Sequence, residues 1–239
     1  MKKIDSFNLS AGRLIAGKYE ILGLLGQGWE GEVYKIRERN SGIERAAKLF
    51  YPTRNLKDKA VRFYVGKLHK LRNCSMVIQY HNEEHIRIRG HEITVMISEF
   101  VDGLLLSDLV KRYRGNRLPP YMALHLLYAL AVGLEEIHQL GDYHGDLHSD
   151  NIIVQRQGVS FELRLLDMFN WGAPKPINMF DDTVDLISLF HEILGGQKHY
   201  ASHPEWVKDI CCGRKRSIIR TKFRTAGELR AYLEAITIV

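Results

Sequence analysis

Apolar and polar positions alternate through much of the first hundred residues, which is the pattern of half-buried β-strands. Such runs occupy residues 18–25, 32–36, 44–50, 86–89 and 93–97. The last two flank Gly90 and predict a hairpin. A single helical pattern interrupts this region over residues 57–72, where Val61, Tyr64 and Leu68 fall on one face. The first hundred residues therefore predict an antiparallel sheet with one helix.

Helical spacing dominates the rest of the chain. Pro119 and Pro120 open a helix that runs to about His138, and a second is predicted over residues 182–194, before two glycines. Strand patterns remain at residues 152–154 and 161–166, and a capping-box sequence at residues 224–229 opens a final helix. The pattern is that of an α+β protein whose second half is mostly helical.

Composition adds three limits. The 239 residues suffice for one large domain or two small lobes, and 45% hydrophobic content is ordinary for a globular protein. A net charge of +6 is too small to indicate a dedicated nucleic-acid binder. The longest apolar stretch, residues 121–134, falls short of the ~20 residues of a membrane span. The spacing of the three cysteines suggests neither a disulfide framework nor a metal site, and no secretory signal pattern is seen, so we expect a cytoplasmic protein. The sequence does not indicate the oligomeric state.

Candidate chemistry lies in the stretch from His144 to Asn151. Asp146 stands five residues before Asn151, on a loop between a helical and a strand pattern. A carboxylate can accept the proton of an attacking hydroxyl, and a carboxamide oxygen is a hard ligand for Mg²⁺. A further acid, Asp167, follows the strand at 161–166. The plainer alternative is that Asp146 and Asp150 are turn formers in a loop.

A glycine loop connects the first two strands, with the sequence Gly26-Gln27-Gly28-Trp29-Glu30-Gly31. Glycines there let backbone N–H groups approach phosphates where a Cβ would collide. A dinucleotide-binding fold would need a helix after the glycines, but the residues after Gly31 alternate like a strand. Lys48 follows Val33 by fifteen residues, so a simple hairpin would place the two opposite each other. An exposed strand lysine is the alternative for Lys48.

Read together, these stretches resemble the motifs of the protein kinase superfamily, and bacterial serine/threonine kinases of eukaryotic type in particular. The motifs are G-Q-G-W-E-G, A-A-K ending at Lys48, H-G-D-L-H-S-D-N, D-M-F from Asp167 and R-T-A-G-E-L near the carboxyl end. The resemblance implies a single kinase-like domain over residues 1–239. Its small antiparallel N-lobe with one helix would cover residues 1–101, and a shortened, mostly helical C-lobe residues 102–239.

The resemblance also implies roles. The cofactors would be ATP and Mg²⁺, with ATP between the lobes. The acceptor would be a Ser or Thr hydroxyl of a protein, and the kinase itself is one candidate acceptor. Asp146 would be the base, Lys48 would hold phosphates, and His148 would stand where many protein kinases place a lysine. His144 and Asp185 would support the loop. Asn151 and Asp167 would bind magnesium. The ATP site would comprise Gly26, Gln27, Gly28, Gly31, Val33, Ala46, Lys48, Ser98, Glu99, Val101 and Ile153.

Four departures from the family pattern stand out. The helix at 57–72 has no glutamate to pair with Lys48, and Tyr64 or Lys67 falls in its place. Gly145 replaces the arginine that would hold a phosphorylated loop, Lys175 replaces the acid of A-P-E, and seventeen residues separate Asp167 from Asp185. We therefore predict no activation-loop phosphoswitch.

Two other functions remain open from the sequence. A small-molecule kinase is one, because aminoglycoside phosphotransferases and choline kinases have a similar H-G-D-L-H loop and the segment after Asp167 is short. A pseudokinase scaffold is the other, because the helix glutamate is missing. The basic residues over 54–72 suggest an acidic protein partner, although most such faces are only solvated.

Overall fold

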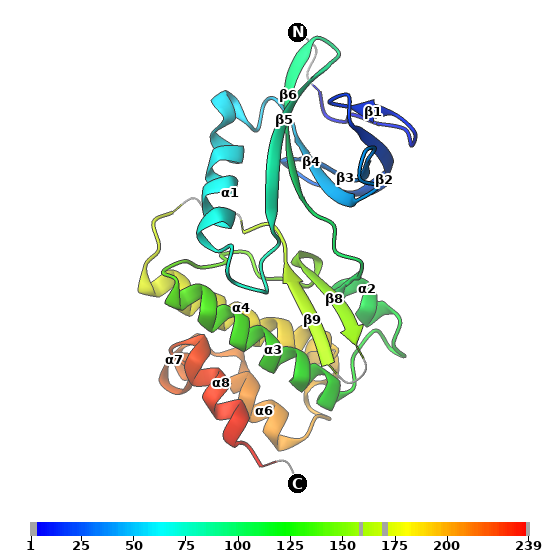
Figure 1. The fold of residues 1–239 in the computed structure, drawn as a ribbon. Helices are drawn as coiled ribbons and strands as arrows, with labels where there is room; N and C mark the ends of the chain where they lie inside the picture. The colour runs from blue at the N-terminus through cyan, green and yellow to red at the C-terminus, as the bar shows by residue number, and fades with distance from the viewer. Residues whose placement is uncertain (1–3, 158–159, 169–171, 238–239) are drawn as a thin grey trace. The chain divides into compact units, whose positions relative to one another are not determined.

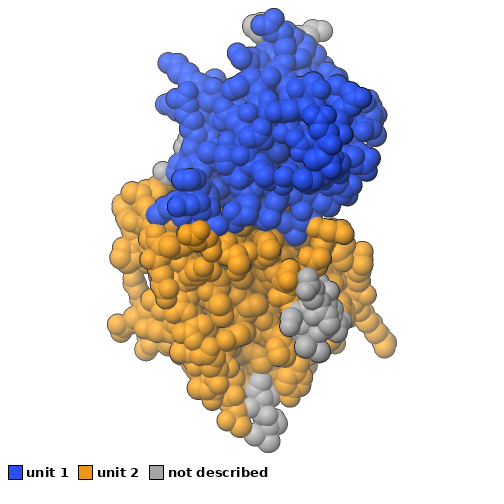
Figure 2. Space-filling view, in the orientation of Figure 1, with its two compact units in different colours: residues 1–72, 78–101 blue, residues 73–77, 102–239 orange. Residues whose placement is uncertain are grey.

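The computed structural model describes residues 4–157, 160–168 and 172–237. The chain forms two compact units (Figure 2). Unit 1 comprises residues 1–72 and 78–101, and unit 2 comprises residues 73–77 and 102–239. The predictions that fall on residues 158–159 and 169–171 lie outside the described residues.

Unit 1 is an antiparallel sheet with one α-helix (Figure 1). The strand order is β1-β2-β3-β4-β6-β5. The strands are β1 (Leu14–Ile15), β2 (Tyr19–Gln27), β3 (Gly31–Glu38), β4 (Glu44–Phe50), β5 (Tyr80–Ile88) and β6 (His91–Glu99). Helix α1 (Lys59–Lys70) follows a 3₁₀ turn, η1 (Leu56–Asp58). It begins two residues after the predicted start because Lys57 and Asp58 both have positive φ.

The strand register places the candidate residues of unit 1 on one face. Val33 lies opposite Lys48, which confirms the hairpin register, and Ala46 lies opposite Ser98. Because directly paired residues point to the same side of a sheet, these four side chains share a face. Strand pairing alone therefore brings Lys48 and Ser98 to the same face, and Gly26 of the glycine loop pairs with Val33.

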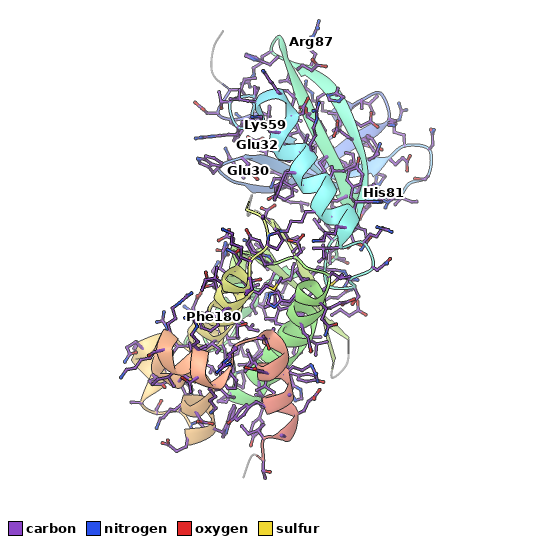
Figure 3. All side chains as sticks on the ribbon, turned by 90° about the vertical axis from the view of Figure 1, so that its left-hand side faces the viewer. Glu30, Glu32, Lys59, His81, Arg87 and Phe180 are labelled. Atoms are coloured by element: carbon purple, nitrogen blue, oxygen red, sulfur yellow. The ribbon has the colours of Figure 1, made fainter. Side chains whose placement is uncertain are left out.

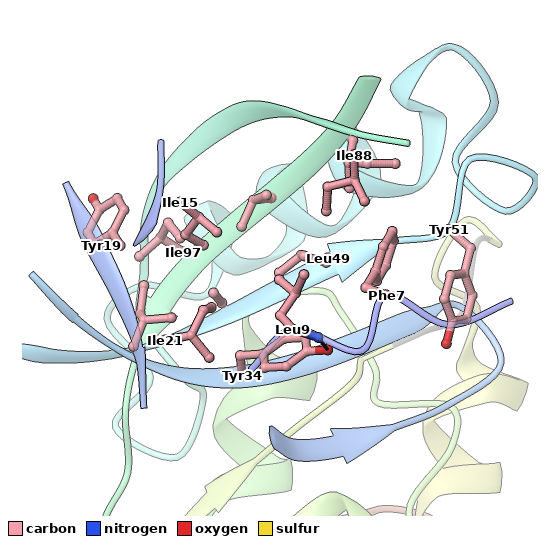
Figure 4. Packing of buried hydrophobic residues seen from close by; sticks show 14 of the residues in the cluster. Phe7, Leu9, Ile15, Tyr19, Ile21, Tyr34, Leu49, Tyr51, Ile88 and Ile97 are labelled. Atoms are coloured by element: carbon pink, nitrogen blue, oxygen red, sulfur yellow. Dashed lines mark hydrogen bonds between the residues drawn. The ribbon is translucent and has the colours of Figure 1, made fainter. Parts of the chain in front are cut away.

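The opposite face carries the apolar core of unit 1 (Figure 4). Ile21, Tyr34, Leu49 and Ile97 are buried there. Residues 4–9 cover this face: the Phe7 ring stacks on Tyr51 with centroids 5.2 Å apart, and the Leu9 N–H donates to the Tyr34 hydroxyl at 3.1 Å. The amino-terminal segment is therefore part of the fold, which the sequence pattern did not predict.

Unit 2 combines a three-stranded sheet with a group of helices. The strands are β7 (Leu104–Leu105), β8 (Ile152–Gln157) and β9 (Ser160–Leu165), in that order across the sheet. The helices are α2 (Leu106–Lys111), α3 (Pro120–Gln139), α4 (Pro176–Ile193), α5 (Gly196–Tyr200), α6 (Glu205–Cys211), α7 (Arg216–Lys222) and α8 (Ala226–Ala235), with 3₁₀ turns η2 (Ser149–Asn151) and η3 (Cys212–Arg214).

Helices α3 and α4 form the core of unit 2, and α8 packs against both. Leu130 and Leu134 of α3 are fully buried, as are Leu186 and Phe190 of α4. Within the described residues, no helix is both long and apolar enough to cross a membrane.

Helix α4 begins six residues before the predicted start at Asp182. Pro176 occupies its first turn, where a missing N–H costs nothing, and the Lys175 N–H donates to Asn178 Oδ1 at 3.1 Å. The longer helix places Asp182 in its second turn, and its carboxylate is fully buried.

We predict that Gly31→Ala destabilises unit 1. A Cβ at residue 31 would lie 1.9 Å from the Leu49 carbonyl oxygen, and backbone cannot move aside cheaply. Urea unfolding should show a loss of about 1–3 kcal/mol. Gly28→Ala is the matched control, because a Cβ there meets no atom of the described residues within 4 Å, and it should unfold like the wild type. Equal unfolding of both variants would contradict this packing.

Candidate functional site

One buried carboxylate organises the loop of residues 143–151 in unit 2. Asp182 Oδ2 accepts the N–H of His144 at 2.7 Å, and Oδ1 accepts the N–H of Gly145 at 2.7 Å. His138 Nε2 lies 2.9 Å from Oδ2. Gly145 has φ +82°, a conformation that glycine adopts without strain. Helix α4 therefore fixes the backbone from which Asp146 projects.

His144 ties this loop to the end of strand β9. Its Nδ1 accepts the N–H of Asp146 at 3.2 Å, so the neutral ring carries its proton on Nε2. That nitrogen lies 3.0 Å from the Leu166 carbonyl oxygen and donates to it. Leu166 precedes Asp167, which has φ +46°. A fully buried imidazole thus links the backbones beside the two candidate aspartates.

The side chains of Asp146, His148 and Asn151 converge. Asn151 Nδ2 donates to the Asp146 carbonyl oxygen at 2.9 Å and to its carboxylate Oδ2 at 3.3 Å. His148 Nε2 lies 3.5 Å from the same Oδ2. The Asp146 side chain remains 55% exposed and that of His148 44%. Asp146 is therefore oriented by two neighbours while its carboxylate stays open to solvent.

The residues of this loop fit a magnesium ion that arrives with a phosphate substrate. Asn151 makes its contacts through Nδ2, and its Oδ1 accepts no hydrogen bond from the described residues. No group of three or more His, Cys, Asp or Glu side chains suited to a metal occurs in the described part of the chain. Mg²⁺ needs no such cage, since it is commonly held by one or two protein oxygens plus phosphates and water.

The expected supporting role of Asp185 is wrong. Asp182, three residues earlier on α4, accepts the loop N–H groups, and the Asp185 side chain makes no hydrogen bond with the described residues. Burial, together with the negative charges of Asp182, Asp181 and Asp146, raises the pKa of the Asp185 carboxyl to about 6. The role of Asp185 was implied by the family resemblance, and periodicity alone cannot tell which of two acids on one helix faces the loop.

The glycine loop of unit 1 is a tight turn between β2 and β3. The Gly28 N–H donates to the Gly31 carbonyl at 2.9 Å. A Cβ at Gly26 or Gly28 would meet no described atom within 4 Å, so packing does not require glycine at either position. The open backbone suits close approach by phosphate oxygens. The Gln27 side chain donates from Nε2 to the Tyr51 hydroxyl at 3.0 Å.

Lys48 is buried and has a carboxylate partner that the sequence analysis missed. Its Nζ lies 2.9 Å from Glu30 Oε2, with 8% and 10% of the two side chains exposed. The Tyr64 hydroxyl of α1 lies 3.3 Å from the same Nζ. This overturns the alternative of an exposed strand lysine. The one available signal was the presence of an acid inside the glycine loop.

The remaining predicted residues are placed as follows. Val33, Ala46 and Ser98 share the Lys48 face of the sheet. The Glu99 N–H donates to the Gln79 carbonyl at 2.9 Å, and Val101 ends unit 1. Ile153 lies in β8 of unit 2, opposite Leu105. The structure thus brings Val33, Ala46, Lys48 and Ser98 together within unit 1 and Asp146, His148 and Asn151 within unit 2, while Ile153, a further candidate ATP residue, belongs to unit 2.

A β-rich unit with one helix and a helical unit carrying a carboxylate–carboxamide loop together define a protein of the kinase fold, which confirms the predicted fold class. A crystal structure of the Mycobacterium tuberculosis PknI kinase domain aligns with a TM-score of 0.64 and 18% identity. The alignment covers 95% of this chain and 97% of that domain. The fold is therefore shared at low sequence identity.

Residues 19–207 match the family model of the protein kinase domain, so the chain belongs to the protein kinase domain family. The serine/threonine-protein kinase MRCK gamma of Mus musculus is 27% identical over 227 residues, which are 92% of this chain and 14% of MRCK gamma. The serine/threonine-protein kinase pkn2 of Myxococcus xanthus is 28% identical over 159 residues, which are 64% of this chain and 18% of pkn2. The chain spans under a fifth of either relative.

The raised pKa of Asp185 predicts a pH-dependent cost. Its folded pKa of about 6 exceeds the unfolded value near 3.9, so the folded state binds more protons between these values and stability falls as pH rises through that window. Asp185→Asn should therefore raise the unfolding free energy by about 1–2 kcal/mol above pH ~6 and leave it unchanged below pH ~4. Denaturant titrations across this range measure the difference, with the exposed Asp150→Asn as control. A pH-independent gain at Asp185 would contradict the charge argument.

Proposed function

We propose that this chain is an ATP- and Mg²⁺-dependent phosphotransferase that transfers the γ-phosphate to a Ser or Thr hydroxyl of a protein. We further propose that residues 1–239 act as one kinase domain, with residues 1–101 and 102–239 as its lobes. Membership of the protein kinase domain family supports the reaction class. The relatives named above are serine/threonine-protein kinases, which supports a protein acceptor.

The observation that carries the proposal is the state of Asp146. Its carboxylate is oriented by Asn151 Nδ2 and His148 yet remains half exposed, as a base that must meet a hydroxyl from outside requires. In the proposed reaction the acceptor oxygen bonds to the γ-phosphorus, the bond to the β–γ bridging oxygen breaks and ADP leaves. Asp146 receives the proton of the hydroxyl, a contribution of about 10²–10⁴-fold in rate.

The other residues would position and neutralise charge. The open backbone at Gly26 and Gly28 would lie against phosphates, and the Lys48 ammonium would offset their negative charge. Asn151 Oδ1 and Asp167 would hold Mg²⁺, which when bound neutralises charge on the phosphate oxygens. His144 would keep the loop of Asp146 and the backbone before Asp167 in a fixed relation.

A small-molecule kinase is the second candidate. Seventeen residues between Asp167 and Asp185 leave little chain for a peptide platform, which favours a small alcohol as acceptor. The scaffold alternative has less support, because Lys48, Asp146, Asn151 and Asp167 are all present and Asp146 is held by hydrogen bonds. The acceptor distinguishes these three functions.

We predict that Asp146→Asn lowers turnover by about 10²–10⁴-fold, because the amide cannot accept the hydroxyl proton as the carboxylate does. The assay uses Mg²⁺ and γ-labelled ATP with the protein alone, with generic protein substrates and with small alcohols. Asp150→Asn is the matched control, an exposed acid of the same loop, and should stay within about threefold of wild type.

Lys48→Met should also abolish transfer, because it removes the charge that neutralises the phosphates. Undiminished turnover in both Asp146→Asn and Lys48→Met would overturn the assignment. Label on small alcohols alone would establish the second candidate. ATP binding without any label would establish the scaffold.

A further inference from the structure

The carboxylate beside Lys48 comes from the glycine loop and not from the helix. We propose that Glu30 takes the place of the missing helix glutamate and is the positioning residue that holds the Lys48 ammonium for nucleotide phosphates. This inference rests on the proposed function and adds a residue to its machinery. Glu30 and Glu32 lie close together at the start of β3 (Figure 3).

The first support is the demand of the buried charge. The Lys48 side chain is 8% exposed, and a buried ammonium is costly unless an anion and hydrogen-bond acceptors compensate it. Tyr64 supplies a neutral hydroxyl at 3.3 Å and an aromatic face, with its ring centroid 4.4 Å from Nζ. Glu30, at 2.9 Å, supplies the negative charge. Helix α1 and the glycine loop therefore share the task that one helix glutamate would otherwise perform.

The second support is that two other acids of unit 1, Glu32 and Asp58, have hydrogen-bond partners of their own. Glu32 Oε1 accepts the Phe7 N–H at 2.9 Å and its carboxylate is bonded by the Tyr34 and Tyr51 hydroxyls. Asp58 accepts from Asn55 Nδ2 at 2.9 Å and from Thr94 Oγ1 at 2.5 Å. Glu30 Oε2, in contrast, lies 2.9 Å from Lys48 Nζ.

The third support is that the backbone of Glu30 is fixed. Its carbonyl oxygen accepts the Tyr51 N–H at 2.8 Å. On one side Gly31 packs directly against the Leu49 carbonyl, and on the other the Trp29 ring lies 3.9 Å from the Arg54 guanidinium carbon. Because both neighbours are anchored, the carboxylate is delivered to Lys48 by a pre-organised turn. Such pre-organisation is what a positioning group needs.

Binding of Mg·ADP and of adenosine by isothermal titration calorimetry tests the proposal. Glu30→Gln should weaken Mg·ADP binding about tenfold, because Lys48 loses the charge that orients it, and should leave adenosine affinity unchanged. Glu44→Gln is the matched control. Glu44 pairs with the strand lysine Lys35 at 2.6 Å in the same sheet, so its loss should leave both affinities at wild-type values.

Relocating the carboxylate provides the decisive variant. Tyr64 already reaches Lys48 from α1, so Glu30→Gln combined with Tyr64→Glu should restore Mg·ADP affinity to within about threefold of wild type. A purely structural role for Glu30 would not be rescued from another element. If Glu30→Gln alone does not fold, the double variant still decides the matter, since failure to bind Mg·ADP would overturn the proposal.

The remaining outcomes are also decisive. Unchanged Mg·ADP affinity in Glu30→Gln would overturn the positioning role while leaving the proposed function intact. Tighter binding would overturn it too, because Glu30 would then compete with the phosphates for Lys48. If the wild-type chain binds neither ligand, the proposed function itself fails, and this inference fails with it.

Discussion

The candidate site of unit 2 depends on the buried carboxylate of Asp182. Three donors converge on it, two from the loop backbone and one from His138. A carboxylate this deeply buried is stable only while those donors are present. The loop in turn keeps its conformation only while the carboxylate accepts its N–H groups. Because His144 also bonds the Leu166 carbonyl, the same constraint extends to the backbone before Asp167. Helix α4 thereby fixes residues that precede it in the chain by more than thirty positions.

Unit 1 solves a similar problem of buried charge by different means. Its lysine projects from a central strand, where α1 offers a tyrosine and not a carboxylate. Charge compensation comes from the turn between β2 and β3, whose conformation is set by Gly31 against Leu49 and by the Tyr51 N–H. The glycine loop, whose open backbone suits contact with phosphates, therefore also contributes the charged side chain of Glu30. In both units a well-fixed element holds a carboxylate against its partners. In unit 2, α4 holds Asp182 against the loop N–H groups, and in unit 1 the glycine loop holds Glu30 against the Lys48 ammonium.

The sequence predicted what depends on local periodicity and on hairpin register. Val33 and Lys48 meet because fifteen residues separate them in an antiparallel pair, and this confirmed pairing brings Ala46 and Ser98 to the same face. Family membership and fold class were predicted from the order of the motifs along the chain, and the comparisons with known proteins confirmed both. The roles of the individual site residues stay predictions.

Contacts that depend on tertiary placement escaped the sequence, each for a physical reason. Asp182 and Asp185 lie on the same helix, and only the packing of that helix against the loop decides which of them accepts the loop N–H groups. Glu30 pairs with Lys48 across eighteen positions through a turn that periodicity does not describe. Residues 4–9 have no repeating pattern, yet Phe7 and Leu9 cover the apolar face of the sheet. With that face covered by residues of its own chain, the opposite face of the sheet carries Lys48 together with Val33, Ala46 and Ser98.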